Sequence, residues 1–484
     1  MPRSVDNDLL VRFVDETQDL RAFYSTEDES CNLESPGQTF SASHHDDLFS
    51  SALESSPATL LPIATPGLEI LSTDDAHNLE TSPAEASHRT KLFSDIPAGS
   101  LLGRAGPNLT QKCTAFPLKQ DYEVRLMKHY IDHMCHWFDL CDTKGHHFAY
   151  EVPKRAITCP TLLNAIFALS SRHLSITGHF DEYASDRYHQ ECLKHLTTIS
   201  DDASALTNDD LLAATILLRT LEELEVPLVG TDYQGHLLGI QVFMNTQSTS
   251  VASSLRQASF WIGLRQEIYM AFVNQRPVKT KLDHSFIDRS FSPADDDTWA
   301  NRIIVNCAEI TKFCFNQDEQ TISNYNKLKD YDAQWLDSRP LSFLPLSYRE
   351  PDQSVGEVFP EICYLSHAIV IGVVHSIFAR VLLMCYNPTL PRIGPSQKQA
   401  QQQMEDEIKS QIKELCGTAL SNQLTMPGMF TACMGVAMCG DRFTDRDEQV
   451  ALLNVLTTTE QAHAWPTATA QTHLKKAWGW VDET

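Results

Sequence analysis

Helical periodicity from about residue 118 to the C-terminus is the feature that most restricts the fold. Apolar side chains recur there every three or four residues, and short breaks containing Pro, Gly, Asn or Asp separate the segments. We find no convincing run of alternating apolar and polar residues, the pattern typical of half-buried strands. We therefore expect an all-α fold, with a large multi-helix domain preceded by a disordered acidic N-terminal region.

The periodic segments also predict which helices lie at the centre. The body of 211–225 is apolar on nearly every side, so it should be surrounded by other helices, and Thr207 and Asp210 are spaced as a capping box. The longest apolar stretch, Ala368 to Tyr386, contains His375 and Arg380, which favours a buried core helix over a membrane span. The expected helices are Tyr122–Leu140, Cys159–Ser175, Tyr183–Ile199, Leu211–Glu225, Gln234–Met244, Arg256–Phe272, Trp299–Phe315, Ile362–Tyr386, Gln401–Leu420, Asp447–Thr457 and roughly His463–Val481.

Charge and composition divide the chain into regions. The whole chain carries a net charge of −25, and residues 1–110, with six basic and 18 acidic side chains, contribute −12 of it. This region is rich in Ser, Thr, Asp and Pro, so we interpret it as disordered. Residues 111–390 should form an all-helical domain, and 391–484 either its helical continuation or a subdomain. Apolar residues between Leu9 and Tyr24 interleave with acids, a pattern of activation segments that a solvated tail can also show.

The remaining signals exclude several classes of protein. So acidic a chain, with no visible basic patch, is not expected to bind nucleic acid directly or to associate with a membrane. Thirteen cysteines, none at C-x-x-C spacing, indicate a reduced intracellular chain without a disulfide framework. The first 20 residues contain five acids and no long apolar core, so no secretory signal is expected there. No nucleophile elbow, P-loop or dinucleotide fingerprint is present.

Two polar clusters are candidates for binding. His129, His133 and His136 would share one helical face, where they could hold a metal or could simply be histidines at a helix edge. The charged end of the central helix is the other cluster, since charges beside apolar helices must be paired or solvated. It predicts either an ion-pair network, for instance Arg265 with Glu222 or Glu223, or a polar cavity for a ligand. The candidate ligand-binding residues are Arg219, Arg265, Phe260, Trp261 and Tyr269.

Several short stretches occur in an informative order: Leu126–Asp142, Phe148, Val152–Ala156, Cys159–Leu174, Tyr188–Leu193, Leu212–Arg219 with Glu222 and Glu223, Asp232 with His236–Gly239, Phe260–Trp261 and Leu264–Phe272. Together they resemble the fungal-specific transcription factor domain, the all-helical middle region of zinc binuclear cluster regulators. The resemblance is strongest over about residues 115–320. The resemblance implies that 111–390 is a regulator's helical domain. It transfers no catalytic residue, because the family has none in common.

The chain departs from that family at its N-terminus. A six-cysteine zinc cluster with a basic flank normally stands there, whereas residues 1–110 contain one cysteine, Cys31, and no basic run. We therefore expect a regulator-like fungal protein without its own DNA-binding cluster, nuclear or nucleocytoplasmic and linked to secondary metabolism. It would act through protein partners, a second copy of itself among them, and through a small ligand, with no cofactor and no enzymatic activity.

An enzyme on the same helical scaffold is the alternative. Asn301 and Glu309 are spaced as in the metal motif of class I terpene cyclases, although Val305 replaces the hydroxyl residue between them. In this reading the protein is a cytoplasmic cyclase that acts on a prenyl diphosphate with Mg²⁺. Arg219 or Arg265 would bind the diphosphate, and Phe260, Trp261, Tyr269 and Phe272 would line the pocket. The metal candidates are Glu222, Glu223, Asp232, Asn301 and Glu309.

Overall fold

Helices dominate the chain, as the periodicity predicts. The structure is a computed structural model that describes residues 115–178, 180–199, 207–225, 227–228 and 253–480. Helices of all kinds make up 71% of it, which confirms the all-α prediction. The expected disordered region 1–110 and the expected helix 234–244 lie outside the described residues.

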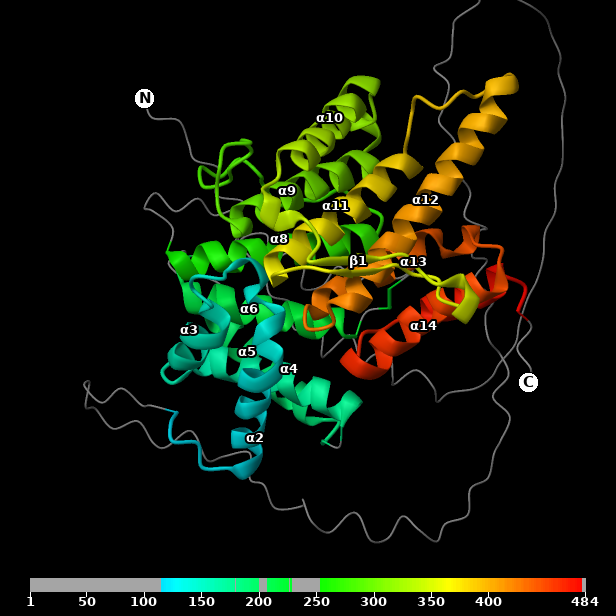
Figure 1. The fold of residues 1–484 in the computed structure, drawn as a ribbon. Coiled ribbons are helices and arrows are strands. Elements are labelled where there is room, and N and C mark those ends of the chain that lie inside the picture. Colours follow the sequence, from blue (N-terminus) through cyan, green and yellow to red (C-terminus); the bar gives the residue numbers. More distant parts are fainter. Residues whose placement is uncertain (1–114, 179, 200–206, 226, 229–252, 481–484) are drawn as a thin grey trace, which may run out of the picture. The chain divides into compact units, whose positions relative to one another are not determined.

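The described α-helices begin at α2 and end at α15 (Figure 1). In chain order they are α2 (Asp121–His129), α3 (His147–Ala156), α4 (Pro160–Thr177), α5 (Ala184–Ile199), α6 (Asp209–Glu223), α8 (Ser254–Val273), α9 (Asp296–Phe315), α10 (Ile322–Ser338), α11 (His367–Cys385), α12 (Pro395–Ser421), α13 (Met426–Cys439), α14 (Arg446–His463) and α15 (Ala468–Ala477). The described residues belong to one compact unit. In the view of Figure 1, α2 to α6 lie at the lower left, α9 to α11 above them and α12 to α14 at the right.

Several helices bury side chains around most of their circumference and together form the core. Among them are α4, α6, α8, α9, α11 and α13. α4 packs against α5 and α6, and α11 packs along α9 and against α12 and α13. α11 is long and apolar enough to cross a membrane, but 83% of its most apolar window is buried inside the protein. The polar interruptions at His375 and Arg380 thus belong to a core helix.

The N-terminus of α6 is capped by a different residue from the one predicted. The expected capping box of Thr207 and Asp210 does not cap α6. Instead the Asn208 side chain accepts hydrogen bonds from the backbone N–H groups of Asp210 and Leu211. An Asx side chain at this position satisfies the first free donors of a helix as well as Ser or Thr does.

The first expected helix is also interrupted. α2 ends at His129 and continues as a π-helical turn over Tyr130–Met134, followed by two short 3₁₀ turns that end at Cys141. Because a π-turn changes the angular spacing of side chains, the alignment expected at His136 is lost, whereas His133 still lies beside His129, with ring centroids 5.0 Å apart.

A two-stranded antiparallel sheet is the exception to the helical fold. β1 (Ser347–Arg349) pairs with β2 (Glu361–Cys363). β2 is attached to the C-terminal end of α12: the Ile362 N–H donates to Ser421 Oγ at 3.0 Å, and Asn422 Nδ2 donates to the Ile362 carbonyl at 2.8 Å. The expected helix 362–386 was therefore too long at its start, since α11 begins only after the Ser366 N-cap.

Gly417 of α12 allows the hairpin to approach this helix. A Cβ at Gly417 would lie 2.2 Å from the backbone oxygen of Pro360, which cannot move without shifting β2. We expect Gly417→Ala to lower the free energy of unfolding by about 2 kcal/mol, because overpacking against backbone outweighs the helix propensity gained. Gly428→Ala in α13, where the nearest atom would be 3.7 Å away, is the matched control and should change stability by less than about 1 kcal/mol. Urea unfolding measures both; an equal response of the two variants would contradict the packing described.

Candidate ligand-binding site

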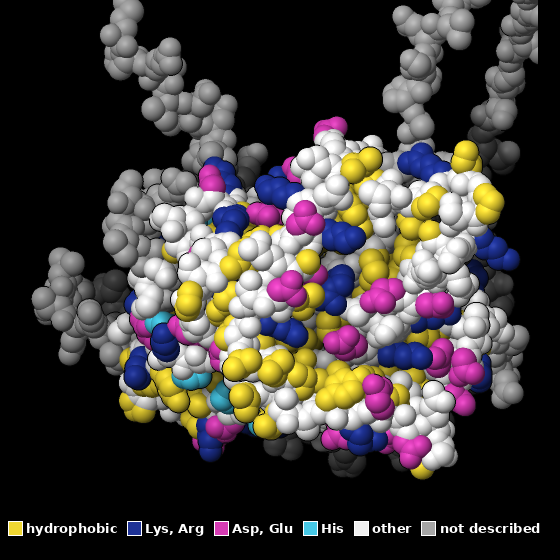
Figure 2. Space-filling view, turned by 45° about the horizontal axis from the view of Figure 1, so that its top comes forward, with side chains coloured by type: hydrophobic (Ala, Val, Ile, Leu, Met, Phe, Trp, Pro, Cys, Tyr) yellow, Lys and Arg dark blue, Asp and Glu magenta, His cyan; other side chains and the backbone are white. Residues whose placement is uncertain are grey.

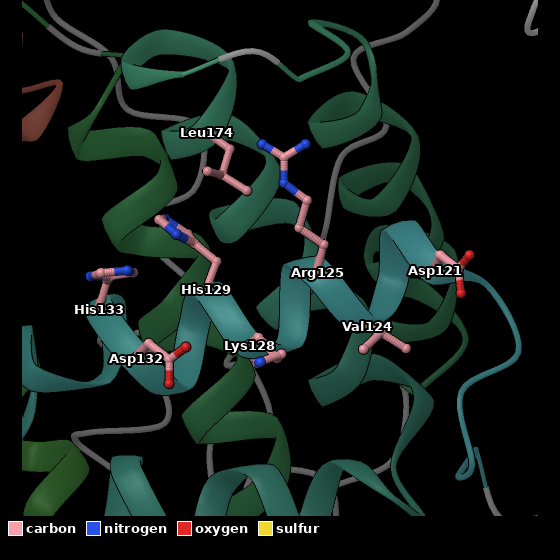
Figure 3. A pocket seen from close by; sticks show the side chains of 8 residues that line it. All are labelled: Asp121, Val124, Arg125, Lys128, His129, Asp132, His133 and Leu174. Atoms are coloured by element: carbon pink, nitrogen blue, oxygen red, sulfur yellow. The ribbon is translucent and has the colours of Figure 1, made fainter.

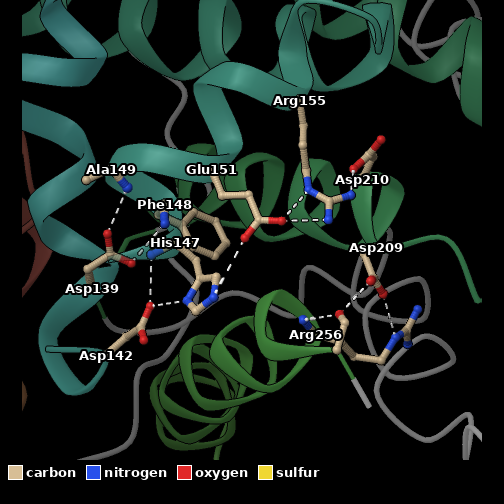
Figure 4. Close-up of polar contacts among 11 residues, drawn as sticks. Asp139, Asp142, His147, Phe148, Ala149, Glu151, Arg155, Asp209, Asp210 and Arg256 are labelled. Atoms are coloured by element: carbon tan, nitrogen blue, oxygen red, sulfur yellow. Dashed lines mark hydrogen bonds and ion pairs between the residues drawn. The ribbon is translucent and has the colours of Figure 1, made fainter. Parts of the chain in front are cut away.

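Hydrogen bonds and ion pairs connect α3, α6 and α8, the helices around the candidate site (Figure 4). Asp139 accepts hydrogen bonds from the backbone N–H groups of Phe148 and Ala149 at 3.0 and 2.8 Å, which caps α3. Arg155 of α3 then bridges Glu151, through Nε at 2.7 Å, and Asp210 of α6, through Nη1 at 2.8 Å. A second ion pair, Arg256 Nε to Asp209 Oδ1 at 2.8 Å, joins α8 to the start of α6. The N-terminal ends of α6 and α8 are thereby fixed.

At the other end of α6, Arg219 lies beside two acidic side chains of its own helix. Its Nη1 lies 2.8 Å from Glu222 Oε2, and its Nε lies 3.9 Å from Glu223 Oε1. The spacings i, i+3 and i, i+4 place these groups on one helical face. Arg219 and Glu223 are both 4% exposed, so both side chains lie inside the protein.

Tyr269 of α8 and Trp465, in the segment after α14, lie beside this ion pair. The centroids of their rings are 5.1 Å apart, and Trp465 in turn stacks on Phe430 of α13 with centroids 3.7 Å apart. Burial, followed by the nearby Glu223 carboxylate, raises the pKa of Tyr269 well above its ordinary value. We call Arg219, Glu222, Glu223, Tyr269 and Trp465 the Arg219 cluster.

Four buried polar atoms of the Arg219 cluster form no hydrogen bond of ordinary geometry with any residue that the structure describes. They are Arg219 Nη2, Glu223 Oε1, the Tyr269 hydroxyl and Trp465 Nε1. A weak contact with Trp465 nevertheless acts to lower the pKa of Tyr269 against the larger effect of burial. Leaving a buried polar atom unpaired costs about 1–3 kcal/mol, so most such groups in proteins have a partner or bind water. The Arg219 cluster is therefore a candidate site for a molecule that supplies the missing partners.

The charge of the Arg219 cluster restricts what that molecule can be. Burial raises the pKa of Glu223 to about 8, even though the Arg219 charge acts in the opposite direction. At neutral pH Glu223 is therefore mostly a neutral carboxylic acid, while Arg219 is neutralised by Glu222. A neutral polar molecule with acceptor groups for Arg219 and Trp465 fits this arrangement better than an anion.

The other expected ligand residues lie elsewhere. Arg265 does not pair with Glu222 or Glu223: its Nη2 donates to the Phe138 carbonyl at 2.9 Å, and burial lowers its pKa. Phe260 and Trp261 contact each other, with ring centroids 5.3 Å apart, and both pack on Phe286. The structure thus brings Arg219 and Tyr269 together but does not bring Arg265, Phe260 and Trp261 to them. Sequence reasoning missed Trp465 as a site residue. It placed Trp465 inside the expected helix His463–Val481, whereas the structure has a short break before Pro466, between α14 and α15.

The metal candidates are dispersed as far as the structure describes them. Glu222 and Glu223 pair with Arg219, and Glu309 on α9 pairs with Arg289 at 3.1 Å. Asn301 is 8% exposed and its Oδ1 has no hydrogen-bond partner. Asp232, like His236, lies outside the described residues. No group of three or more His, Cys, Asp or Glu side chains in the described ranges is placed to hold a metal ion, so nothing there favours the cyclase alternative.

The histidine cluster keeps two of its three expected members and gains another. The rings of His129 and His133 lie together, with centroids 5.0 Å apart, and His129 Nε2 lies 3.0 Å from Nδ1 of His173 on α4. His136, which follows the π-turn, is exposed. Burial and neighbouring histidines lower the pKa of His129 to about 4 and that of His173 to about 3, so both rings are neutral. Beside them a pocket of about 480 Å³ opens along α2 (Figure 3). Its lining residues are Asp121, Val124, Arg125, Lys128, His129, Asp132, His133 and Leu174.

The region from α2 to α8 is similar to a known protein family. Residues 125–273 match the fungal specific transcription factor domain, as the resemblance implies. No zinc-cluster domain is detected in the chain. Searches of the curated proteins and of the solved structures found no match.

Protonation of Glu223 makes a testable contribution to stability. Its pKa is about 8 in the folded protein, against an ordinary value of 4.5. As the pH rises between these values, the unfolded chain releases this proton while the folded protein keeps it. The free energy of unfolding should therefore fall, by up to about 1.4 kcal/mol per pH unit from this group, and the decline should stop above about pH 8.

Urea unfolding at several pH values from about 5 to 9 measures this contribution. Glu223→Gln, which has no proton to release, should flatten the decline. Glu309→Gln is the control, because this ion-paired side chain is 35% exposed and should leave the slope unchanged. A Glu223→Gln curve parallel to that of the wild type would show that Glu223 is ionised in the folded protein.

Proposed function

We propose that this chain is a regulator of fungal transcription that acts in the nucleus through protein partners. The observation that carries the proposal is the match of residues 125–273 to the fungal transcription factor domain. We extend the proposal to genes of secondary metabolism, to a second copy of the chain as one partner and to an acidic N-terminal region that supplies transcriptional output.

Surface charge supports action through partners. On the face shown in Figure 2, Lys and Arg side chains are interspersed with Asp and Glu, and hydrophobic side chains show between them. Proteins that bind DNA alone usually gather basic side chains into a patch or stripe. The face drawn in Figure 2 shows no such stripe, which supports recruitment to DNA by a partner protein.

A reporter assay tests this proposal directly. The chain is fused to an unrelated DNA-binding domain, and transcription is measured with and without residues 1–110. We expect the deletion to remove most of the output but to leave the helical body folded, since helices α2 to α15 all lie after residue 110. Circular dichroism of the deleted protein is the control for folding. Full output from a folded deletion protein would contradict the proposed role of the acidic region.

The Arg219 cluster is proposed as the regulator's ligand site, for a small neutral polar molecule. Tyr269→Phe removes a buried hydroxyl that forms no hydrogen bond of ordinary geometry with a described residue, so the purified protein should gain about 1 kcal/mol of stability. In the reporter assay the same variant should lose output, because the ligand loses a contact.

Tyr130→Phe is the matched control for this prediction. The Tyr130 hydroxyl is also buried, but it donates to the Phe148 carbonyl at 3.0 Å, so the variant should lose about 1 kcal/mol. Its output should follow its stability. If Tyr269→Phe is stabilised and keeps full output, the Arg219 cluster is not a ligand site that controls transcription.

A further inference from the structure

Two cysteines from different helices meet where those helices end. Cys385 is the last residue of α11 and Cys439 is the last residue of α13. Their Sγ atoms lie 3.8 Å apart, and both thiols are free. Residues at a helix end are less constrained by backbone hydrogen bonds than residues in its interior. The two sulfur atoms therefore have room to approach each other.

The surroundings of the two sulfur atoms differ. Cys439 is completely buried, whereas Cys385 is partly exposed. Arg442, in the 3₁₀ turn after α13, places Nη2 4.0 Å from Cys385 Sγ. Glu405 of α12 pairs with Nη1 of Arg442. The Nε of Arg442 is buried and has no hydrogen-bond partner among the described residues. The guanidinium is thus held beside the more accessible of the two thiols.

This asymmetry favours a thiolate at Cys385. The hydrogen bond between the two thiols lowers the pKa of Cys385 and raises that of Cys439, and the Arg442 charge lowers the pKa of Cys385 further. Burial acts in the opposite direction on cysteines deep in the core: it raises the pKa of Cys307 and of Cys433 to about 12. Since the thiolate is the reactive form of cysteine, oxidation should begin at Cys385.

We propose that Cys385 and Cys439 are an oxidation site, which a hydroperoxide such as hydrogen peroxide converts to a disulfide. The Cys385 sulfur attacks one peroxide oxygen, the O–O bond breaks, and a sulfenic acid and hydroxide form. The Cys439 sulfur then attacks Cys385 Sγ; the S–S bond forms, the S–O bond breaks, and oxygen leaves as water with the thiol proton. In total the two thiols lose two hydrogens, and hydrogen peroxide is reduced to two molecules of water.

The geometry requires only a small movement. A disulfide has an S–S distance of about 2 Å, so the sulfur atoms must approach by about another 2 Å. Cys314 of α9 is the competing thiol, because it lies near Cys385, but its Sγ faces the Leu382 carbonyl at 3.8 Å and it is fully buried. The disulfide would join the C-terminal ends of α11 and α13, two helices that pack against each other.

Peptide mapping of the oxidised full-length protein tests the proposal. The protein is treated with hydrogen peroxide near neutral pH, free thiols are blocked with N-ethylmaleimide, and the digest is analysed by mass spectrometry without reduction. We expect a peptide pair that links Cys385 to Cys439 and disappears after reduction. In Cys439→Ser, Cys385 should instead accumulate a sulfenic acid that dimedone traps, and Arg442→Met should slow oxidation of Cys385 several-fold.

Cys433→Ser is the matched control, because Cys433 is a second fully buried cysteine of α13. It should keep the Cys385–Cys439 link and show whether loss of a buried thiol in this helix disturbs folding. The mapping of the wild-type protein does not depend on any variant. Recovery of Cys385 and Cys439 as unlinked peptides, or a link from Cys385 to Cys314, would overturn the proposal.

Discussion

Burial of α11 is the constraint on which the rest of this structure depends. Its apolar side chains point in every direction, so it needs protein on every side, and α9, α12 and α13 provide it. The polar residues of α11 are paired or neutral inside the protein. Arg380 pairs with Asp332 of α10 at 3.0 Å, and burial lowers the pKa of His375 to about 4, which keeps that ring neutral. A helix that is long and apolar enough to cross a membrane is thus buried at the centre of the helical core.

Much of the fold could be predicted from the sequence, because long amphipathic or wholly apolar segments leave a periodic signal. α4, α5, α6, α8 and α9 begin and end within a few residues of their predicted positions. α13 was not predicted because its own Met, Ala, Cys and Gly residues lie on every side of the helix, so no separate apolar face can be recognised. α3 contains Pro153, and α10 is largely polar, so both resemble breaks between helices. The strands, at three residues each, are too short to show alternation.

The candidate site could be predicted only where it is local in sequence. Arg219 pairs with Glu222 and Glu223 because they lie one helical turn away, and the spacing alone indicates this. The position of Arg265 depends on how α8 packs on the turns that follow α2, and its expected pairing with Glu222 or Glu223 was therefore wrong. Trp465 reaches Tyr269 through the packing of α14 and the segment after it, which no local pattern reports. Tertiary packing thus determines which polar groups remain without partners.

We infer that residues 125–273, which match the transcription factor domain, and the helices after residue 273 share one core and unfold as one unit. Native-state hydrogen exchange of the full chain in increasing urea tests this claim most directly. If the claim holds, the slowest amides of α4 and α6, inside the matched segment, and those of α11 and α13, outside it, will converge on the same free energy of opening. Opening of α4 and α6 at a clearly different free energy from α11 would show two independent cores and contradict the account.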